Sequence, residues 1–105
     1  MRQIYAGVMS GTSMDGVDAV IADFAPATGG PCVLLAAVRL PFARGLADEL
    51  MGLQRSGADE LARAARAANA LADLYGDAIN AARDRAGLGA ADIVAAGVHG
   101  QTLRH

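Results

Sequence analysis

The sequence predicts an α/β fold with the element order β-β-β-α-α-β. Three observations lead to this prediction. Three short apolar runs follow one another near the N-terminus, two segments with helical spacing come next, and one further apolar run lies near the C-terminus. Strands with short connections favour an antiparallel meander, and a helical connection to a later strand is typical of α/β folds. The 105 residues have room for one domain.

The strands are expected where β-compatible residues run between turn signals. They span residues 4–9, 17–24, 32–40 and 93–98. A polar, glycine-bracketed turn separates the first two strands, and Gly29-Gly30 marks the turn before the third. Cys32, the single cysteine, is expected to be a small core residue.

Two helices are expected between the third and fourth strands. The first covers residues 45–53. The second has Ser56 as its N-cap, Asp59 in a capping-box position, and Gly87 as a left-handed C-cap with Leu88 beside it. Its apolar stripe consists of Leu61, Ala64, Ala68, Leu71, Tyr75, Ile79, Ala82 and Ala86. The many alanines predict that this helix packs closely on its neighbours.

The composition excludes several classes of function. Charged residues make up 19% of the chain and the net charge is −2. Such a chain is not basic enough to bind nucleic acid, and its apolar runs end well before the roughly 18 residues of a membrane span. We therefore expect no nucleic-acid partner and no membrane association. The lone cysteine and the absence of a signal-peptide pattern favour a cytoplasmic location.

The densest functional signal is the loop between the first two strands and the start of the second. Its residues are Gly11, Thr12, Ser13, Met14, Asp15, Gly16, Val17 and Asp18. Glycines let a backbone turn tightly and present N–H groups to an anion, and hydroxyls add hydrogen bonds to phosphate oxygens. Carboxylates can face a triphosphate only with a cation between them, which implies Mg²⁺ held through its water shell. The pattern predicts a phosphate loop.

Two common phosphate-binding patterns do not fit this loop. Gly11 and Gly16 have the Walker A spacing, but Val17 stands where that pattern requires Lys, and the chain contains no Lys. A strand is expected after the loop, where Walker A needs a helix, and the G-x-G-x-x-G pattern is also missing. The alternative is an ordinary hairpin with a long polar turn. Gly16 is expected to adopt a positive φ.

A second polar group follows the fourth predicted strand. It contains His99, Gln101 and Thr102. Because α/β folds place ligand sites at strand ends, and because amide and hydroxyl groups suit the hydroxyl and N-acetyl groups of a sugar, we expect these residues to bind a sugar. The alternative is a polar strand exit with a satisfied histidine. His99 and His105 have no third ligand nearby, so no metal site is expected.

The two segments resemble the signatures of the anhydro-N-acetylmuramic acid kinase family. Residues 8–19, VMSGTSMDGVDA, are similar to its N-terminal signature, and residues 98–105, VHGQTLRH, are similar to its second. The resemblance covers essentially the whole chain, which would be about the first third of a family member. Since the sequence stops at a functional loop, we expect residues 1–105 to be a truncated kinase lobe.

The resemblance implies a fold, an activity and roles for the two segments. The fold would be ribonuclease-H-like, as in sugar kinases, actin and heat-shock ATPases. The activity would be an ATP-dependent sugar kinase that opens the 1,6-anhydro ring of anhydro-N-acetylmuramic acid with water and phosphorylates O6, in peptidoglycan recycling. Residues 11–18 would bind ATP with Mg²⁺, and the full-length protein could form a homodimer. The family's water-activating aspartate lies later in the chain, so no catalytic residue is assigned here.

Two other classes of function stay open beside the kinase. A non-catalytic nucleotide-binding or interaction module of the same fold is the main alternative. A ribonuclease-H-like nuclease fits less well, because the first strand carries no acidic residue and the chain is not basic.

Overall fold

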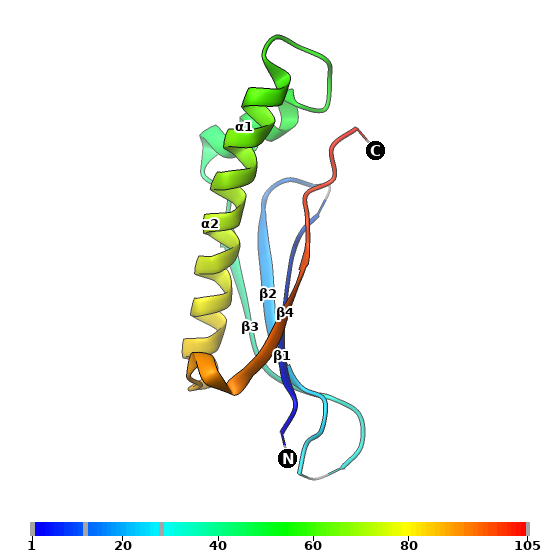
Figure 1. Ribbon diagram of the computed structural model, residues 1–105, viewed down its shortest axis with the longest axis vertical. Helices are drawn as coiled ribbons and strands as arrows, with labels where there is room; N and C mark the ends of the chain where they lie inside the picture. Colours follow the sequence, from blue (N-terminus) through cyan, green and yellow to red (C-terminus); the bar gives the residue numbers. More distant parts are fainter. Residues whose placement is uncertain (1, 12, 28, 105) are drawn as a thin grey trace.

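The computed structural model describes every residue except Met1, Thr12, Thr28 and His105. The described residues form four strands and two α-helices, with one short 3-10 turn (Figure 1). In chain order these are β1 (Ile4–Ser10), β2 (Gly16–Asp23), β3 (Val33–Pro41), α1 (Arg44–Gly52), α2 (Glu60–Ala86), the 3-10 turn (Ala90–Asp92) and β4 (Ile93–His99). The predicted order of strands and helices is confirmed, and the 3-10 turn is an addition to it.

The strands form a mixed sheet in the order β3-β2-β1-β4. β2 runs antiparallel to both β1 and β3, as the predicted meander requires, whereas β4 runs parallel to β1. Parallel strands end at the same edge of a sheet. The β1–β2 loop (residues 11–15) and the segment after β4 (residues 100–104) therefore leave the sheet at the same edge, close to α1 (Figure 1).

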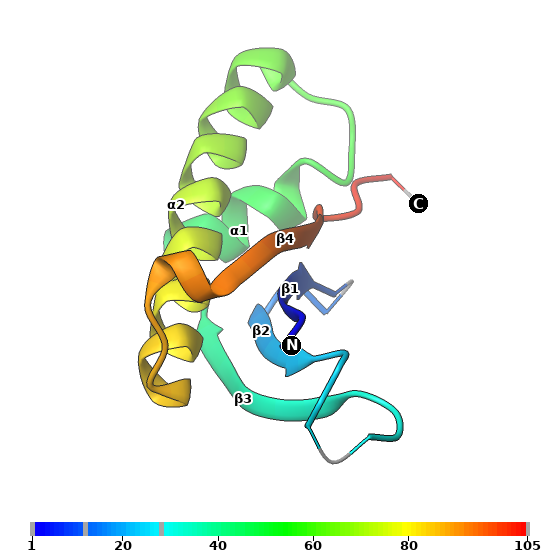
Figure 2. The ribbon, with the colours of Figure 1, turned by 60° about the horizontal axis from the view of Figure 1, so that its bottom comes forward.

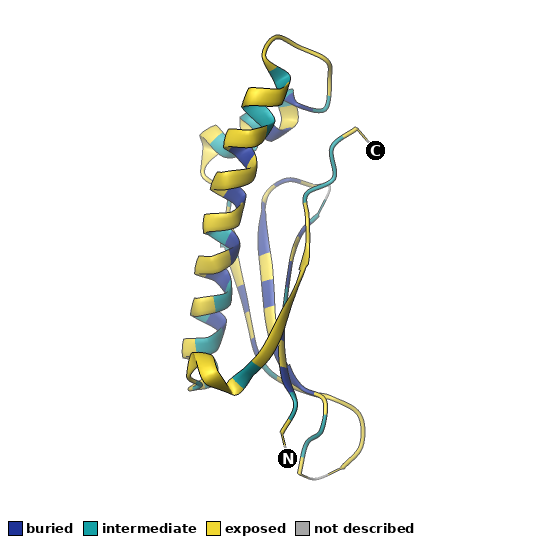
Figure 3. Cartoon of the chain, in the orientation of Figure 1, coloured by how far each residue is buried: buried dark blue, intermediate teal, exposed yellow. Residues whose placement is uncertain are grey.

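Both helices cover the same face of the sheet, as Figure 2 shows. Alternate residues of β1 point into the core on this face, and the residues between them point to the opposite, helix-free face. The buried β1 residues are Ile4, Ala6, Val8 and Ser10. On the helix-free face, Tyr5, Met9 and Val20 remain exposed. Figure 3 shows the same division on α2, whose buried residues follow the side that faces the sheet.

α2 packs on the sheet mainly through small side chains. Its buried residues are Ala67, Leu71, Tyr75, Ala78 and Ala82. Ala78 and Ala82 have no exposed surface at all, which confirms the predicted close packing. The predicted stripe is wrong at Leu61, which is 86% exposed, and at Ala68, which is also exposed, while the buried Ala67 and Ala78 were not predicted to be on it. The first turn of α2 lies beyond the end of the sheet, so its side chains have no strand to cover them (Figure 1).

The predicted start of α2 is wrong and its predicted end is confirmed. The helix begins at Glu60, and Asp59 before it is left-handed with φ 52°, so Ser56 is no N-cap. Instead the Glu60 carboxylate accepts a hydrogen bond from the Gly57 N–H at 3.2 Å. At the other end Gly87 has φ 72°, and the Leu88 N–H donates to the Arg83 carbonyl at 3.1 Å. This bond belongs to the Schellman motif that terminates helices.

Cys32 is exposed, so its predicted place in the core is wrong. It lies on the β2–β3 connection just before Val33, the first residue of β3, where the chain has not yet reached the helix-covered part of the sheet. Among the described residues, no helix is both long enough and apolar enough to cross a membrane.

Gly16 allows a close approach of two strands and is not a left-handed turn residue. Positive φ values occur at Gly29, Gly30 and Gly87 among the described glycines, and not at Gly16. A Cβ atom added to Gly16 would lie 2.7 Å from the carbonyl oxygen of Leu40. The predicted positive φ is therefore wrong, and the glycine is required because the β3 backbone leaves no room for a side chain.

We predict that Gly16→Ala lowers the free energy of unfolding by about 1–3 kcal/mol, because the new Cβ must displace the β3 backbone. Gly76→Ala is the matched control. A Cβ at Gly76 meets no atom within 4 Å, and Gly76 lies inside α2. The control should therefore raise the free energy of unfolding by about 0.5–1 kcal/mol. Urea unfolding of both variants measures the difference, and equal effects at the two positions would contradict the steric explanation.

Candidate functional site

The β1–β2 loop is held by its own backbone and by the core. The Met14 N–H donates to the Gly11 carbonyl oxygen at 3.1 Å. Met14 is left-handed, with φ 53°, and its side chain is buried in the core. At the end of the loop, the Phe42 N–H donates to the Asp15 carbonyl oxygen at 3.1 Å. These contacts fix the loop to the core on one side and to the end of β3 on the other.

Both carboxylates predicted at the site bind the guanidinium group of Arg39. Its Nη1 lies 2.9 Å from Asp18 Oδ2, and its Nη2 lies 2.6 Å from Asp15 Oδ1. Asp18 and Arg39 are directly paired residues of β2 and β3, so their side chains share one face of the sheet. Asp15 also accepts a hydrogen bond from the Ser13 hydroxyl at 2.8 Å. The Ser13 hydrogen bond and the Arg39 charge hold the pKa of Asp15 below its ordinary value.

Gln101 connects the two predicted site segments directly. Its Nε2 donates to the Gly11 carbonyl oxygen at 3.1 Å and lies 3.3 Å from the Thr102 carbonyl oxygen. A flipped amide would set an oxygen against these two oxygens, so the contacts fix its orientation. Gln101 Oε1 is buried, and it has no hydrogen-bond partner among the described residues. This atom is therefore an acceptor next to the β1–β2 loop.

His99 and Asp18 lie on the helix-free face, separated by β1. Met9 is paired with Asp18 on one side and with His99 on the other. The three residues line a shallow hollow of about 520 Å³ on this face. The first signature thus contributes a carboxylate to the hollow, and the second contributes an imidazole.

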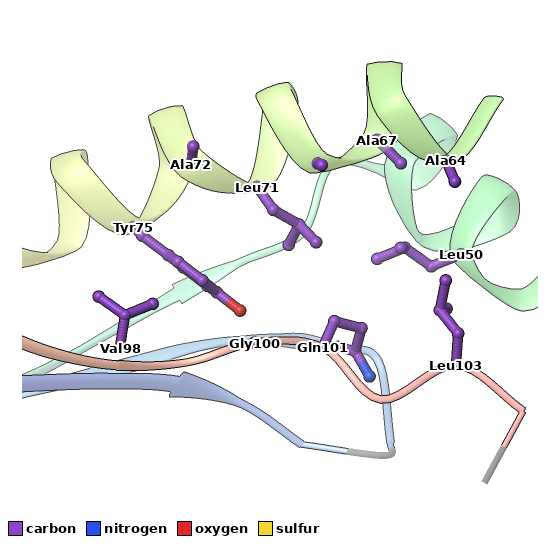
Figure 4. A pocket seen from close by; sticks show the side chains of 11 residues that line it. Leu50, Ala64, Ala67, Leu71, Ala72, Tyr75, Val98, Gly100, Gln101 and Leu103 are labelled. Carbon is purple, nitrogen blue, oxygen red and sulfur yellow. The ribbon is translucent and has the colours of Figure 1, made fainter. Parts of the chain in front are cut away.

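A second cavity, of about 320 Å³, lies on the helix side between α2 and the segment after β4. Figure 4 shows its lining, in which the side chains of Leu50 and Leu71 dominate and Tyr75 and Gln101 supply polar atoms. A sugar ring needs several well-placed hydrogen-bond partners. This cavity offers few of them, and it suits an apolar group better than a sugar.

Tyr75 links α2 to the ends of both parallel strands. Its hydroxyl oxygen lies 2.8 Å from Ser10 Oγ, and it donates to the His99 carbonyl oxygen at 3.3 Å. When the tyrosine donates to His99, the serine hydroxyl donates to the tyrosine. Ser10 is the last residue of β1 and His99 is the last residue of β4, so one hydroxyl connects the points from which both site segments leave the sheet.

Three residues near the site were not assigned to it from the sequence, and two of them carry a weak signal there. Arg39 is a charged residue in an otherwise apolar strand, and an acidic partner on the neighbouring strand is the expected explanation. A tyrosine on an apolar stripe indicates a hydrogen-bond partner, which could have pointed to Tyr75. Gln54 lies in the turn after α1 and has no local signal. It is identified here through its contacts in the structure.

Two of the residues considered in the sequence analysis lie outside the part of the chain that the structure describes. They are Thr12, in the β1–β2 loop, and His105, discussed as a metal ligand. Elsewhere in the described part of the chain, no group of three His, Cys, Asp or Glu residues is placed to hold a metal ion.

A mixed sheet whose glycine-rich loop and second polar segment meet at one edge is compatible with part of a sugar-kinase domain. A family model described as anhydro-N-acetylmuramic acid kinase matches residues 3–105. The chain therefore belongs to the anhydro-N-acetylmuramic acid kinase family.

Curated relatives that carry this name are similar along almost the whole chain. A protein of Bordetella pertussis is 48% identical over 103 residues, which are 98% of this chain and 26% of the relative. One of Paraburkholderia xenovorans is 49% identical over 97% of this chain and 27% of its own length. One of Nitrosomonas europaea is 42% identical over 96% of this chain and 27% of its own. The chain thus spans about a quarter of these relatives, less than the expected third.

The Tyr75 hydroxyl should stabilise the fold together with Ser10. We predict that Tyr75→Phe lowers the free energy of unfolding by about 1–3 kcal/mol, because it leaves a buried serine hydroxyl and a carbonyl without their partner. Ser10→Ala in the Tyr75→Phe background should cost less than it does alone, since its partner is already gone. Urea unfolding of the two single variants and the double variant measures this coupling. Strict additivity would show that the two hydroxyls do not interact.

The pKa of Asp15 should depend on both of its side-chain partners, Ser13 and Arg39. Its pKa is lowered first by the Ser13 hydrogen bond and then by Arg39. We predict that Ser13→Ala and Arg39→Gln each raise the pKa of Asp15. Because the pKa of the folded chain is depressed, these contacts stabilise the loop at neutral pH and are lost as the pH falls through that pKa. Carbon-13 NMR titration measures the shifts. Arg66→Gln, on the exposed side of α2, is the control that should leave Asp15 unchanged.

Proposed function

We propose that this chain is the ATP-binding part of a sugar kinase that opens the 1,6-anhydro ring of anhydro-N-acetylmuramic acid with water and phosphorylates the freed O6. The observation that carries the proposal is the 3.1 Å hydrogen bond from Gln101 Nε2 to the Gly11 carbonyl oxygen. It joins the two segments that resemble the family's signatures, and such contact is expected if one binds the phosphate donor and the other binds the acceptor. Family membership supports the same conclusion.

We infer that the fold is ribonuclease-H-like. An antiparallel meander of three strands, followed by a helical crossover to a fourth strand parallel to the first, supports this assignment. In such a lobe, ligands bind at the edge where the parallel strands end. The reaction would belong to peptidoglycan recycling in the cytoplasm, where ATP is available.

The β1–β2 loop would hold the phosphates of ATP through its backbone and through the hydroxyl of Ser13. Two carboxylates beside a triphosphate need a cation between them and the phosphates. The Arg39 guanidinium already balances part of that charge. Mg²⁺ would therefore be bound mainly by the nucleotide's phosphates, with Asp18 as the carboxylate that reaches its water shell. The bound ion would neutralise charge that develops on the phosphoryl group.

The residues after β4 would contribute unequally to sugar binding. Gln101 would support sugar binding by holding the segment after β4 against the β1–β2 loop, because its amide nitrogen donates to the Gly11 carbonyl oxygen and its amide oxygen is buried. His99 presents its side chain to the hollow that Asp18 also lines. The Thr102 carbonyl oxygen already accepts hydrogen bonds from Gln54 and Gln101. Thr102 would therefore bind the sugar through its hydroxyl.

The test uses the full-length kinase that carries this sequence. We predict ADP release that depends on anhydro-N-acetylmuramic acid, and a turnover that falls roughly tenfold to a thousandfold in Asp18→Asn, the range for loss of one transition-state electrostatic contact. Sugar affinity should change much less. Asp77→Asn, on the exposed side of α2, is the matched control and should retain normal turnover. ATP binding without sugar-dependent ADP release would instead favour a non-catalytic nucleotide-binding module. An active Asp18→Asn enzyme with normal metal dependence would remove Asp18 from the site.

A further inference from the structure

Gln54 contacts both site segments from a third place in the chain. It lies in the turn that follows α1, outside both signatures. Its Nε2 lies 3.3 Å from the Thr102 carbonyl oxygen and 3.7 Å from the sulfur of Met14, and its Oε1 accepts a hydrogen bond from the Arg104 N–H at 2.8 Å. The Gln54 amide thus contacts Met14 of the β1–β2 loop and both Thr102 and Arg104 of the segment after β4.

The surroundings of Gln54 fix the orientation of its amide. Nε2 also lies 3.4 Å from the Leu50 carbonyl oxygen of α1. Donors of the NH₂ group therefore face two carbonyl oxygens, and the amide oxygen faces a backbone N–H. A reversed amide would set oxygen against oxygen and N–H against N–H. The side chain is partly buried in this position, so the contacts are shielded from water on one side.

The turn after α1 holds the segment after β4 through a second set of contacts. The Arg104 guanidinium donates to the carbonyl oxygens of Leu53, at 3.3 Å, and Arg55, at 3.0 Å, and it pairs with the Glu60 carboxylate. The turn after α1 therefore binds the segment after β4 through several contacts. Within this turn, Gln54 also contacts the β1–β2 loop, through Met14.

We propose that Gln54 is a positioning residue that couples nucleotide binding at the β1–β2 loop to sugar binding by the segment after β4. This proposal rests on the proposed function. A shift of the loop when phosphate binds moves Met14, and Met14 contacts the amide that holds Thr102 and Arg104. Each ligand thereby favours the arrangement that the other ligand needs, and the coupling is reciprocal.

The experiment compares four forms of the full-length kinase. They are the wild type, Gln54→Met, Gln54→Glu and Gln3→Met. Gln54→Met retains the side-chain length and loses every hydrogen bond, whereas Gln54→Glu retains the acceptor for the Arg104 N–H and loses the donors toward Thr102. Gln3→Met is the matched control, because Gln3 precedes β1 at the opposite end of the sheet. The affinity for anhydro-N-acetylmuramic acid is measured with and without a non-hydrolysable ATP analogue.

We expect the analogue to tighten sugar binding in the wild type and in Gln3→Met. This enhancement should fall by roughly 3- to 30-fold, or to no enhancement, in Gln54→Met, and by an intermediate factor in Gln54→Glu. Wild-type enhancement in both Gln54 variants would overturn the proposal, as would a wild type whose two ligands bind independently.

Hydrogen exchange of the unliganded proteins tests Gln54 separately from the kinase activity. Gln54→Met should increase exchange in the β1–β2 loop and in the segment after β4 together, while Gln3→Met should change neither. If only one segment or neither loosens, Gln54 does not join them and the proposal fails. If the wild type lacks sugar-dependent ADP release but both segments loosen together, the proposed kinase function fails and the structural link through Gln54 stands.

Discussion

The hydroxyl of Tyr75 is the contact on which the geometry of the candidate site depends. It is bound between the Ser10 side chain and the His99 carbonyl, and these are the last residues of the two parallel strands. Ser10 is 2% exposed, so its hydroxyl has no access to water and depends on this partner. The helix that carries Tyr75 is also the crossover that makes β4 parallel to β1. The same element therefore sets the direction of β4 and aligns the ends from which both site segments leave.

The charged residues of the site orient one another's side chains, and they contribute little to the stability of the fold. Arg39, Asp15 and Asp18 are each about half exposed, and ion pairs in such positions contribute little to the free energy of folding. Their effect is to orient the carboxylates of Asp15, in the β1–β2 loop, and Asp18, in β2, toward the Arg39 guanidinium. A loop with two unbalanced carboxylates would repel a triphosphate. With Arg39 beside them, the local net negative charge is reduced.

The sequence predicted what depends on local patterns and missed what depends on distant contacts. Runs of β-compatible residues between turn signals located the strands, and Gly87 marked the end of α2, because both are decided by neighbours in the chain. Gly16 was assigned the wrong conformation because the atom that excludes its side chain belongs to Leu40 on another strand. The start of α2 was placed too early because Asp59 takes a left-handed conformation that its residue type does not require. At the site, both signatures were identified. Arg39, which binds the carboxylates of the first signature, and Gln54, which contacts both signatures, reach them only through the fold.

Three of the contacts that bring the site segments together join residues far apart in the chain. Gln101 and Gly11 are separated by 90 positions, Ser10 and Tyr75 by 65, and Gln54 and Thr102 by 48. Closing a loop of this length costs conformational entropy that a few polar contacts cannot offset, although the cost rises only slowly with length. The core between α2 and the sheet must therefore supply the free energy that brings these residues together. This explains why the β1–β2 loop places the apolar Met14 at its centre: the loop takes its shape from the same core that aligns the strands.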